Sequence, residues 1–118
     1  MALMFGTSLF NKDISNWDVH NVTKMNYMFV ESIFNKDISR WDVSNVKNMF
    51  GMFSASKFNK DISNWNVGNV TDMSEMFQES KFKQNISNWD IKKVEKHDYM
   101  FEDCPMKNKI TMQPKFKN

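Results

Sequence analysis

Residues 28–51 read MFVESIFNKDISRWDVSNVKNMFG, and this unit decides the fold. The dipeptide Met-Phe that opens the unit recurs every 24 residues, at positions 4, 28, 52, 76 and 100. A fixed period of that length is typical of solenoid proteins, in which each repeat packs only against its neighbours. The sequence therefore predicts a chain built from stacked repeats.

Apolar residues keep their places from one unit to the next, so that stacking in register would place like side chains above one another. The columns are Trp17, Trp41, Trp65 and Trp89; Ile14, Ile38, Ile62 and Ile86; Val19, Val43, Val67 and Ile91; Val22, Val46, Val70 and Val94; and Phe10, Phe34, Phe58 and Phe82, followed by Met106. Each large buried side chain contributes roughly 1.5–3 kcal/mol. These columns predict a core of Phe, Trp, Met and aliphatic ladders.

Two local patterns alternate within each unit. Val22, Met25, Met28 and Phe29 share one face of a helix, and isolated helices of this length are too short to be stable without packing. Residues 17–19 alternate apolar and polar side chains, as a short half-buried strand does. An Asn side chain can accept the free N–H groups of the first turn of a helix. We therefore expect the helices to be capped by Asn21, Asn45 and Asn69.

The predicted fold class is therefore α/β, a leucine-rich-repeat-like solenoid of about four 24-residue strand–turn–helix repeats. Strands stack about 4.8 Å apart and helices about 8–10 Å apart, which predicts a curved stack with the strands on the concave side. We expect a single repeat domain over residues 1–118. Its repeats span about 4–27, 28–51, 52–75 and 76–99, and a C-terminal cap spans 100–118.

Composition narrows the function classes. The chain has 118 residues, a net charge of +2 and one cysteine, Cys104, so neither nucleic-acid binding nor an internal disulfide is expected. No apolar stretch approaches the about 20 residues of a membrane-spanning helix. Residues 1–10 lack the basic segment of a signal peptide, and we read them as the start of the fold.

The pattern Phe-Asn-Lys-Asp-Ile-Ser-Asn-Trp-Asp-Val-Ser-Asn-Val-Thr-x-Met-x-x-Met-Phe resembles the BspA-like leucine-rich-repeat family. It is most similar to the Trp-Asp-Val repeats of mycoplasma-type lipoproteins, also described as palindromic amphipathic repeats. The resemblance covers roughly residues 4–104 and includes four Trp-[Asp/Asn]-[Val/Ile] copies. It implies a leucine-rich-repeat-like solenoid and display at the cell surface or secretion, with adhesion or partner binding.

Two acidic columns could serve chemistry or structure. They are Asp18, Asp42, Asn66 and Asp90, and Asp13, Asp37, Asp61 and Asn85. Stacked carboxylates repel one another, and calcium would be one way to offset that repulsion. The alternative, which we favour, is that these side chains cap turns and face the neighbouring Lys12, Lys36 and Lys60.

Catalysis and metal binding find little support in the composition. The chain has two histidines, His20 and His97, in different columns, whereas a metal site needs three or four convergent ligands. We expect no metal and no cofactor, and no enzyme. A small hydrolase that pairs Cys104 with His97 remains a second alternative, although Cys104 lies in a serine column and is better explained as a small buried residue.

The two ends of the array differ. After residue 83 the repeat decays into a proline- and lysine-containing segment, as a cap does, whereas the first unit has no such cap. Exposed apolar edges invite pairing, so we expect a homodimer through the N-terminal end, or a further repeat in a longer array. The residues of this self-association edge are Met4, Phe5, Phe10, Ile14 and Trp17.

The function that the sequence favours is a non-enzymatic repeat scaffold for protein or glycan binding, with surface adhesion as its setting. The alternative is a structural, self-assembling module without a separate ligand. Solenoids usually bind through extended concave surfaces. The predicted contact residues on the concave strands are Asn16, Asp18, Arg40, Asp42, Asn64, Asn66, Asn88 and Asp90.

Overall fold

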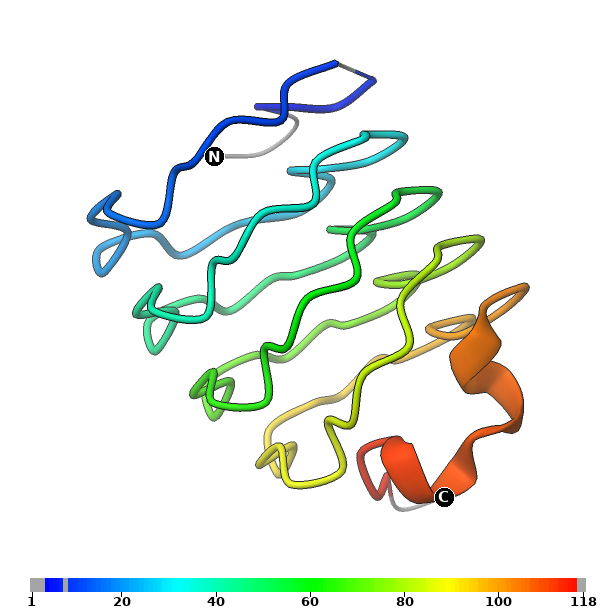
Figure 1. Cartoon of the computed structure of the whole chain (residues 1–118). Coiled ribbons are helices and arrows are strands. Elements are labelled where there is room, and N and C mark those ends of the chain that lie inside the picture. Colours follow the sequence, from blue (N-terminus) through cyan, green and yellow to red (C-terminus); the bar gives the residue numbers. More distant parts are fainter. Residues whose placement is uncertain (1–3, 8, 117–118) are drawn as a thin grey trace.

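The chain winds into a stack of irregular coils, one for each repeat, in a computed structural model that describes residues 4–7 and 9–116 (Figure 1). Backbone hydrogen bonds join each repeat to the next, as from the N–H of Phe29 to the carbonyl oxygen of Met52 at 2.9 Å. The molecule measures 36 × 28 × 19 Å. The 24-residue period therefore is one winding of the chain.

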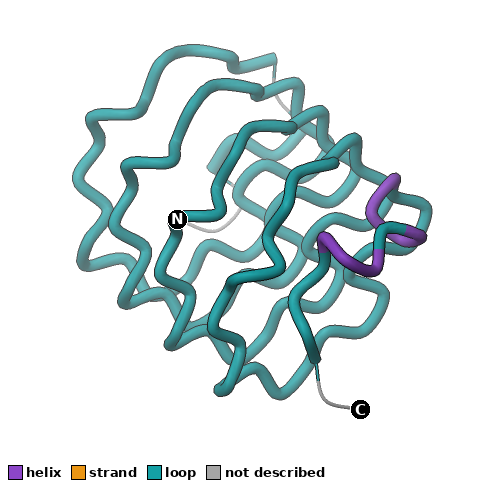
Figure 2. The backbone as a smooth tube through the Cα atoms, turned by 60° about the horizontal axis from the view of Figure 1, so that its bottom comes forward, coloured by secondary structure: helices purple, strands orange, loops and turns teal. Residues whose placement is uncertain are grey.

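Regular secondary structure is nearly absent from the described residues. Their helices are two short 3-10 helices, η1 (Pro105–Asn108) and η2 (Ile110–Met112). Their β-pairing is limited to isolated parallel bridges, which join Lys24 to Asn48, Asn48 to Asp72 and Asp72 to Lys96. Figure 2 shows the coils as loops and turns throughout.

The prediction of an α/β solenoid of strand–turn–helix repeats is wrong. Residues 17–19 form no strand, and residues 22–29, where the helix was expected, contain turns at 26–29 and no helix. Tyr27 and Glu31 have positive φ angles of 60° and 54°, and a right-handed helix cannot pass through such residues. Without helices there is no helix N-terminus for Asn21 to cap, and the reason for expecting a concave strand face disappears.

Residues 25–31 instead form what we call the turn ladder, with its equivalents at 49–55 and 73–79. The N–H groups of Met25, Tyr27, Phe29 and Glu31 donate to carbonyl oxygens of the next coil at 2.8–2.9 Å. The N–H of Met28 donates within the coil, to the carbonyl oxygen of Met25 at 3.2 Å. Because Tyr27 and Glu31 have positive φ angles, some N–H groups of this segment donate to the next coil and others donate within the same coil.

The opposite half of each coil, residues 35–45 with equivalents at 11–21, 59–69 and 83–93, is joined by side chains, and we call it the side-chain ladder. The N–H of Asn59 donates to Oδ1 of Asn35 at 2.9 Å, and the indole N–H of Trp65 donates to the carbonyl oxygen of Ile38 at 3.0 Å. No backbone–backbone hydrogen bond joins residues 35–45 to residues 59–69. The coils are therefore held by different means on their two sides.

The core lies between these halves and is built on two phenylalanine ladders. Rings one coil apart lie 5.5–5.9 Å apart in the column of Phe5, Phe29, Phe53, Phe77 and Phe101. They lie 6.2–6.3 Å apart in the column of Phe10, Phe34, Phe58 and Phe82. The two columns face one another at 4.1–4.5 Å, and buried Met106 continues the second one. The predicted aromatic core is thus confirmed.

Candidate functional site

The eight residues predicted to bind a partner are all exposed, and we call them the polar face. They are Asn16, Asp18, Arg40, Asp42, Asn64, Asn66, Asn88 and Asp90. They lie on the side-chain ladder, where one turn in each coil holds Asn16 or its equivalent. The segment forms no strand, so the polar face is a set of exposed positions, two in each coil, of which Asn16, Arg40, Asn64 and Asn88 lie in turns.

Hydrogen bonds to the backbone fix the acidic column of this face. Oδ1 of Asp42 accepts the Oγ–H of Ser44 at 2.6 Å and its N–H at 3.0 Å, and these bonds lower the pKa of the carboxyl group. Asn66 accepts the N–H of Gly68 at 3.0 Å, and Asp90 accepts that of Lys92 at 3.1 Å. The prediction that these side chains cap turns is confirmed.

The other acidic column does the same one turn earlier in each coil. Asp13, Asp37 and Asp61 accept the N–H of the serine two residues later at 2.8–2.9 Å. That backbone bond is the main cause of the lowered pKa of each carboxyl group, ahead of the charge of Lys36 on Asp13 and of Lys60 on Asp37. Both columns are therefore preorganised by local structure.

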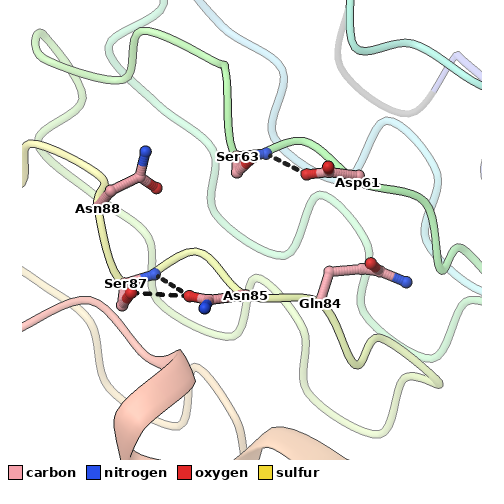
Figure 3. A pocket seen from close by; sticks show the side chains of 6 residues that line it. All are labelled: Asp61, Ser63, Gln84, Asn85, Ser87 and Asn88. Atoms are coloured by element: carbon pink, nitrogen blue, oxygen red, sulfur yellow. Dashed lines mark hydrogen bonds between the residues drawn. The ribbon is translucent and has the colours of Figure 1, made fainter.

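A polar hollow of about 340 Å³ opens between the last two coils, next to the polar face (Figure 3). Its lining residues are Asp61, Ser63, Gln84, Asn85, Ser87 and Asn88. Gln84 stands where earlier coils have lysine, and its Nε2 donates to Oδ1 of Asn59 at 3.0 Å. Asn85 stands where they have aspartate. The sequence analysis did not predict the hollow, although these two exchanges mark it by replacing a lysine and an aspartate with uncharged residues.

The N-terminal coil adds one charged pair to the face. Nδ1 of His20 is hydrogen-bonded to Oδ1 of Asp18, which raises the pKa of the imidazole and lowers that of the carboxyl. Asp42 raises the pKa of His20 further, as the next carboxylate in the column. Across residues 4–7 and 9–116, no three His, Cys, Asp or Glu side chains come together as a metal site.

Cys104 and His97 serve packing in separate places. The Cys104 side chain is buried beside Ser80, with Sγ 3.6 Å from the serine Oγ and 3.4 Å from the carbonyl oxygen of Phe82. Burial raises the pKa of this thiol, which disfavours the thiolate that a nucleophile needs. The ring of His97 stacks on Phe116 at 3.9 Å. In the described residues, Cys104 and His97 thus have different neighbours and no hydrogen bond joins them.

The predicted self-association edge is only partly exposed. Met4 is 52% exposed and Trp17 is 36% exposed, whereas Phe10 is half-buried. Phe5 and Ile14 are buried, so the expectation that Ile14 faces solvent is wrong. Within residues 4–7 and 9–116, the indole N–H of Trp17 has no carbonyl partner like those of Trp41, Trp65 and Trp89.

One comparison with known proteins identifies the family of the chain. A family model described as "Mycoplasma protein of unknown function, DUF285" matches residues 1–113. No curated protein and no solved structure matches the chain. In the described part of the chain, no helix has the length and apolar character needed to cross a membrane.

Proposed function

The chain belongs to the DUF285 family, and we propose that it is a non-enzymatic scaffold that binds a protein or glycan ligand through the polar face. The observation that carries this proposal is the repetition of exposed amide and carboxylate groups, once per coil, on turns fixed by hydrogen bonds. A preorganised surface loses little conformational entropy on binding. Adhesion at a surface is the role implied by the family resemblance of the repeats.

The chemistry of the face favours a ligand that itself repeats hydrogen-bonding groups. Asn64 and Asn88 offer both donors and acceptors, and Asp42 offers an acceptor oxygen beyond the one used in its turn. Sugar hydroxyls and peptide backbone groups match such a surface, and the polar hollow adjoins it between the last two coils. Arg40 supplies a cation for a carboxylate on the ligand.

A matched pair of variants tests the proposal on a glycan array and in adhesion assays. The face variant replaces the four residues of one exposed column, Asn16→Ala, Arg40→Ala, Asn64→Ala and Asn88→Ala. The control variant replaces two exposed lysines elsewhere, Lys57→Ala and Lys81→Ala. We expect ligands bound by the wild type to be retained by the control and lost by the face variant. Equal binding by both variants would contradict the proposal.

We propose self-assembly through the N-terminal end as the second candidate function. Exposed Met4 and Trp17, and the missing indole partner of Trp17, support it because a second copy giving a homodimer would bury apolar surface there. Light scattering at micromolar concentration tests this candidate. A Trp17→Ala change should reduce the mass, and a wild-type mass that stays near 14.1 kDa would contradict the homodimer.

A further inference from the structure

The turn ladder contains four columns of hydrogen-bonded peptide groups that run along the stack. The peptide group between Met52 and Phe53 is typical, because it accepts from the preceding coil and donates to the following one, both at 2.9 Å. The N–H groups of all four columns donate to the next coil at 2.7–3.0 Å and therefore point toward the C-terminal end of the stack. Column by column, the donors are Met25, Met49 and Met73; Tyr27, Gly51 and Glu75; Phe5, Phe29, Phe53 and Phe77; and Thr7, Glu31, Ala55 and Glu79.

Aligned peptide dipoles add to one another, as they do in an α-helix, where the end with unpaired N–H groups carries a partial positive charge. Hydrogen bonds in a chain also polarise one another. Two columns beside the turn ladder run the other way, through the N–H groups of Lys47, Thr71 and Glu95 and of Lys57 and Lys81. Four columns against two leave the positive end of the dipole at the last coil.

The four columns end on the last coil at the N–H groups of His97, Tyr99, Phe101 and Asp103. No described residue provides an acceptor for any of these four groups. Phe101 is only 9% exposed, and buried N–H groups in proteins are nearly always paired. The end of the turn ladder is therefore a row of donors that lacks acceptors.

A hollow of about 690 Å³, which we call the terminal hollow, lies against this row. His97, Tyr99 and Phe101 line one side of it, and Lys107, Thr111 and Lys115 of the tail line the other. The tail covers the other half of the last coil, where the N–H of Ile86 donates to the carbonyl oxygen of Met112 at 2.9 Å. It leaves Tyr99 64% exposed, so the turn-ladder half remains open.

The charged side chains of the terminal hollow add to the dipole. Glu102 also lines the hollow, but its carboxylate is paired with Nζ of Lys107 at 2.7 Å. Lys115 is exposed and forms no ion pair within the described part of the chain. The lining therefore combines unpaired N–H groups with a net positive charge, which is the combination that binds anions at helix N-termini.

We propose that the terminal hollow binds an anionic group, a carboxylate or a phosphate, of a small ligand. The anion accepts from neighbouring N–H groups of the row at Tyr99 and Phe101, and Lys115 supplies the opposite charge. The exposed ring of Tyr99 provides a flat surface for the part of the ligand that carries the anion. The terminal hollow is separate from the polar face, and the inference does not rest on the binding proposed there.

An NMR titration of the ¹⁵N-labelled full chain tests the inference without any variant. The probes are glucuronate, N-acetylglutamate and inorganic phosphate, which distinguish a sugar acid, a peptide-like carboxylate and a phosphate. We expect saturable shifts of the Tyr99 and Phe101 amide signals with at least one of these anions. The Phe53 amide, which already has an acceptor, should not shift. Uncharged glucose is the matched control for glucuronate and should shift none of these signals.

Two charge-reversal variants identify the site. Lys115→Glu places a negative charge in the terminal hollow and should weaken anion binding about tenfold or more, whereas Lys57→Glu changes an exposed lysine elsewhere and should leave the affinity unchanged. Thermal melting confirms that both variants are folded. Absence of saturable shifts with all three anions, equal shifts with glucose, or equal affinities of the two variants would overturn the inference.

Discussion

The two halves of each coil are joined to the neighbouring coil by different kinds of hydrogen bond. In the turn ladder, N–H groups such as those of Phe29 and Phe53 donate directly to carbonyl oxygens of the next coil at 2.9 Å. In the side-chain ladder, the indole of Trp65 and the amide of Asn69 make the connection. A backbone hydrogen bond does not depend on the side chain of its residue, whereas the indole hydrogen bond requires tryptophan.

This difference explains the pattern of variation within the chain. One of the two left-handed positions of each coil is Tyr27, Gly51, Glu75 or Tyr99 in turn, because the backbone alone makes the bonds there. Tryptophan occupies its column in all four coils. The invariant tryptophan column therefore marks a structural joint, whereas the left-handed column accepts several residue types.

The largest effect is expected from removing one joint of the side-chain ladder. Trp65→Ala deletes a side chain that is 3% exposed and its bond to Ile38, and should lower the free energy of unfolding by about 3–5 kcal/mol. Trp17→Ala is the matched control, because Trp17 is 36% exposed and makes no such bond, and should cost about 1–2 kcal/mol. Urea denaturation measures both. Equal losses would show that the indole joints do not hold the coils together.

The turn ladder should respond to backbone conformation instead. Gly51 has φ of 61°, and a Cβ there would lie 2.7 Å from Cε1 of Tyr27, so Gly51→Ala should cost about 1–2 kcal/mol. Ala55 has φ of 55°, and Ala55→Gly should raise stability by up to about 1 kcal/mol. Calorimetry of the two variants checks the opposite signs. A stabilising Gly51→Ala change would contradict the left-handed turn.

The repeat and its columns were predictable because side chains one coil apart must match. The local structure was not, because the spacing of Val22, Met25, Met28 and Phe29 arises equally from a helix and from consecutive turns. The distinguishing fact is the positive φ of Tyr27, and its only trace in the sequence is Gly51 in the same column. A tyrosine at that position does not by itself indicate a positive φ angle.

The candidate site was predictable to a similar degree. Exposure of the polar face follows from its alternation with the Trp and Val columns, and the turn-capping role of residues such as Asp42 follows from their short side chains. The path of residues 105–116 could not be predicted, because the tail leaves the register of the coils. Gln113 and Phe116 gain other partners there, and nothing local in the sequence indicates them.

The smallest effect concerns the pair that is found only in the first coil of the polar face. Asp18 raises the pKa of His20 above its usual value of about 6.5. The stabilisation is present in full below that value, and is lost as the pH rises through the raised pKa. Because the pKa of Asp18 is lowered, the pair also breaks when the pH falls through that lower value.

An NMR titration of the His20 ring protons measures this effect. Asp18→Asn should lower the His20 midpoint, since it removes the largest cause of the shift, and Asp42→Asn should lower it less. The order of the two shifts is the test. A larger change with Asp42→Asn would mean that the stacked column, not the local pair, controls the histidine.

Hydrogen exchange observed by NMR tests most directly whether side chains join the coils in one half and backbone groups in the other. We predict that the indole N–H groups of Trp41, Trp65 and Trp89 exchange at least about tenfold more slowly than that of Trp17, because each of the three donates to a carbonyl oxygen of the preceding coil and Trp17 has no such bond among the described residues. The backbone N–H groups of Phe29 and Phe53 should be protected in the same spectra. Four indoles that exchange at one rate would contradict this division of the coil.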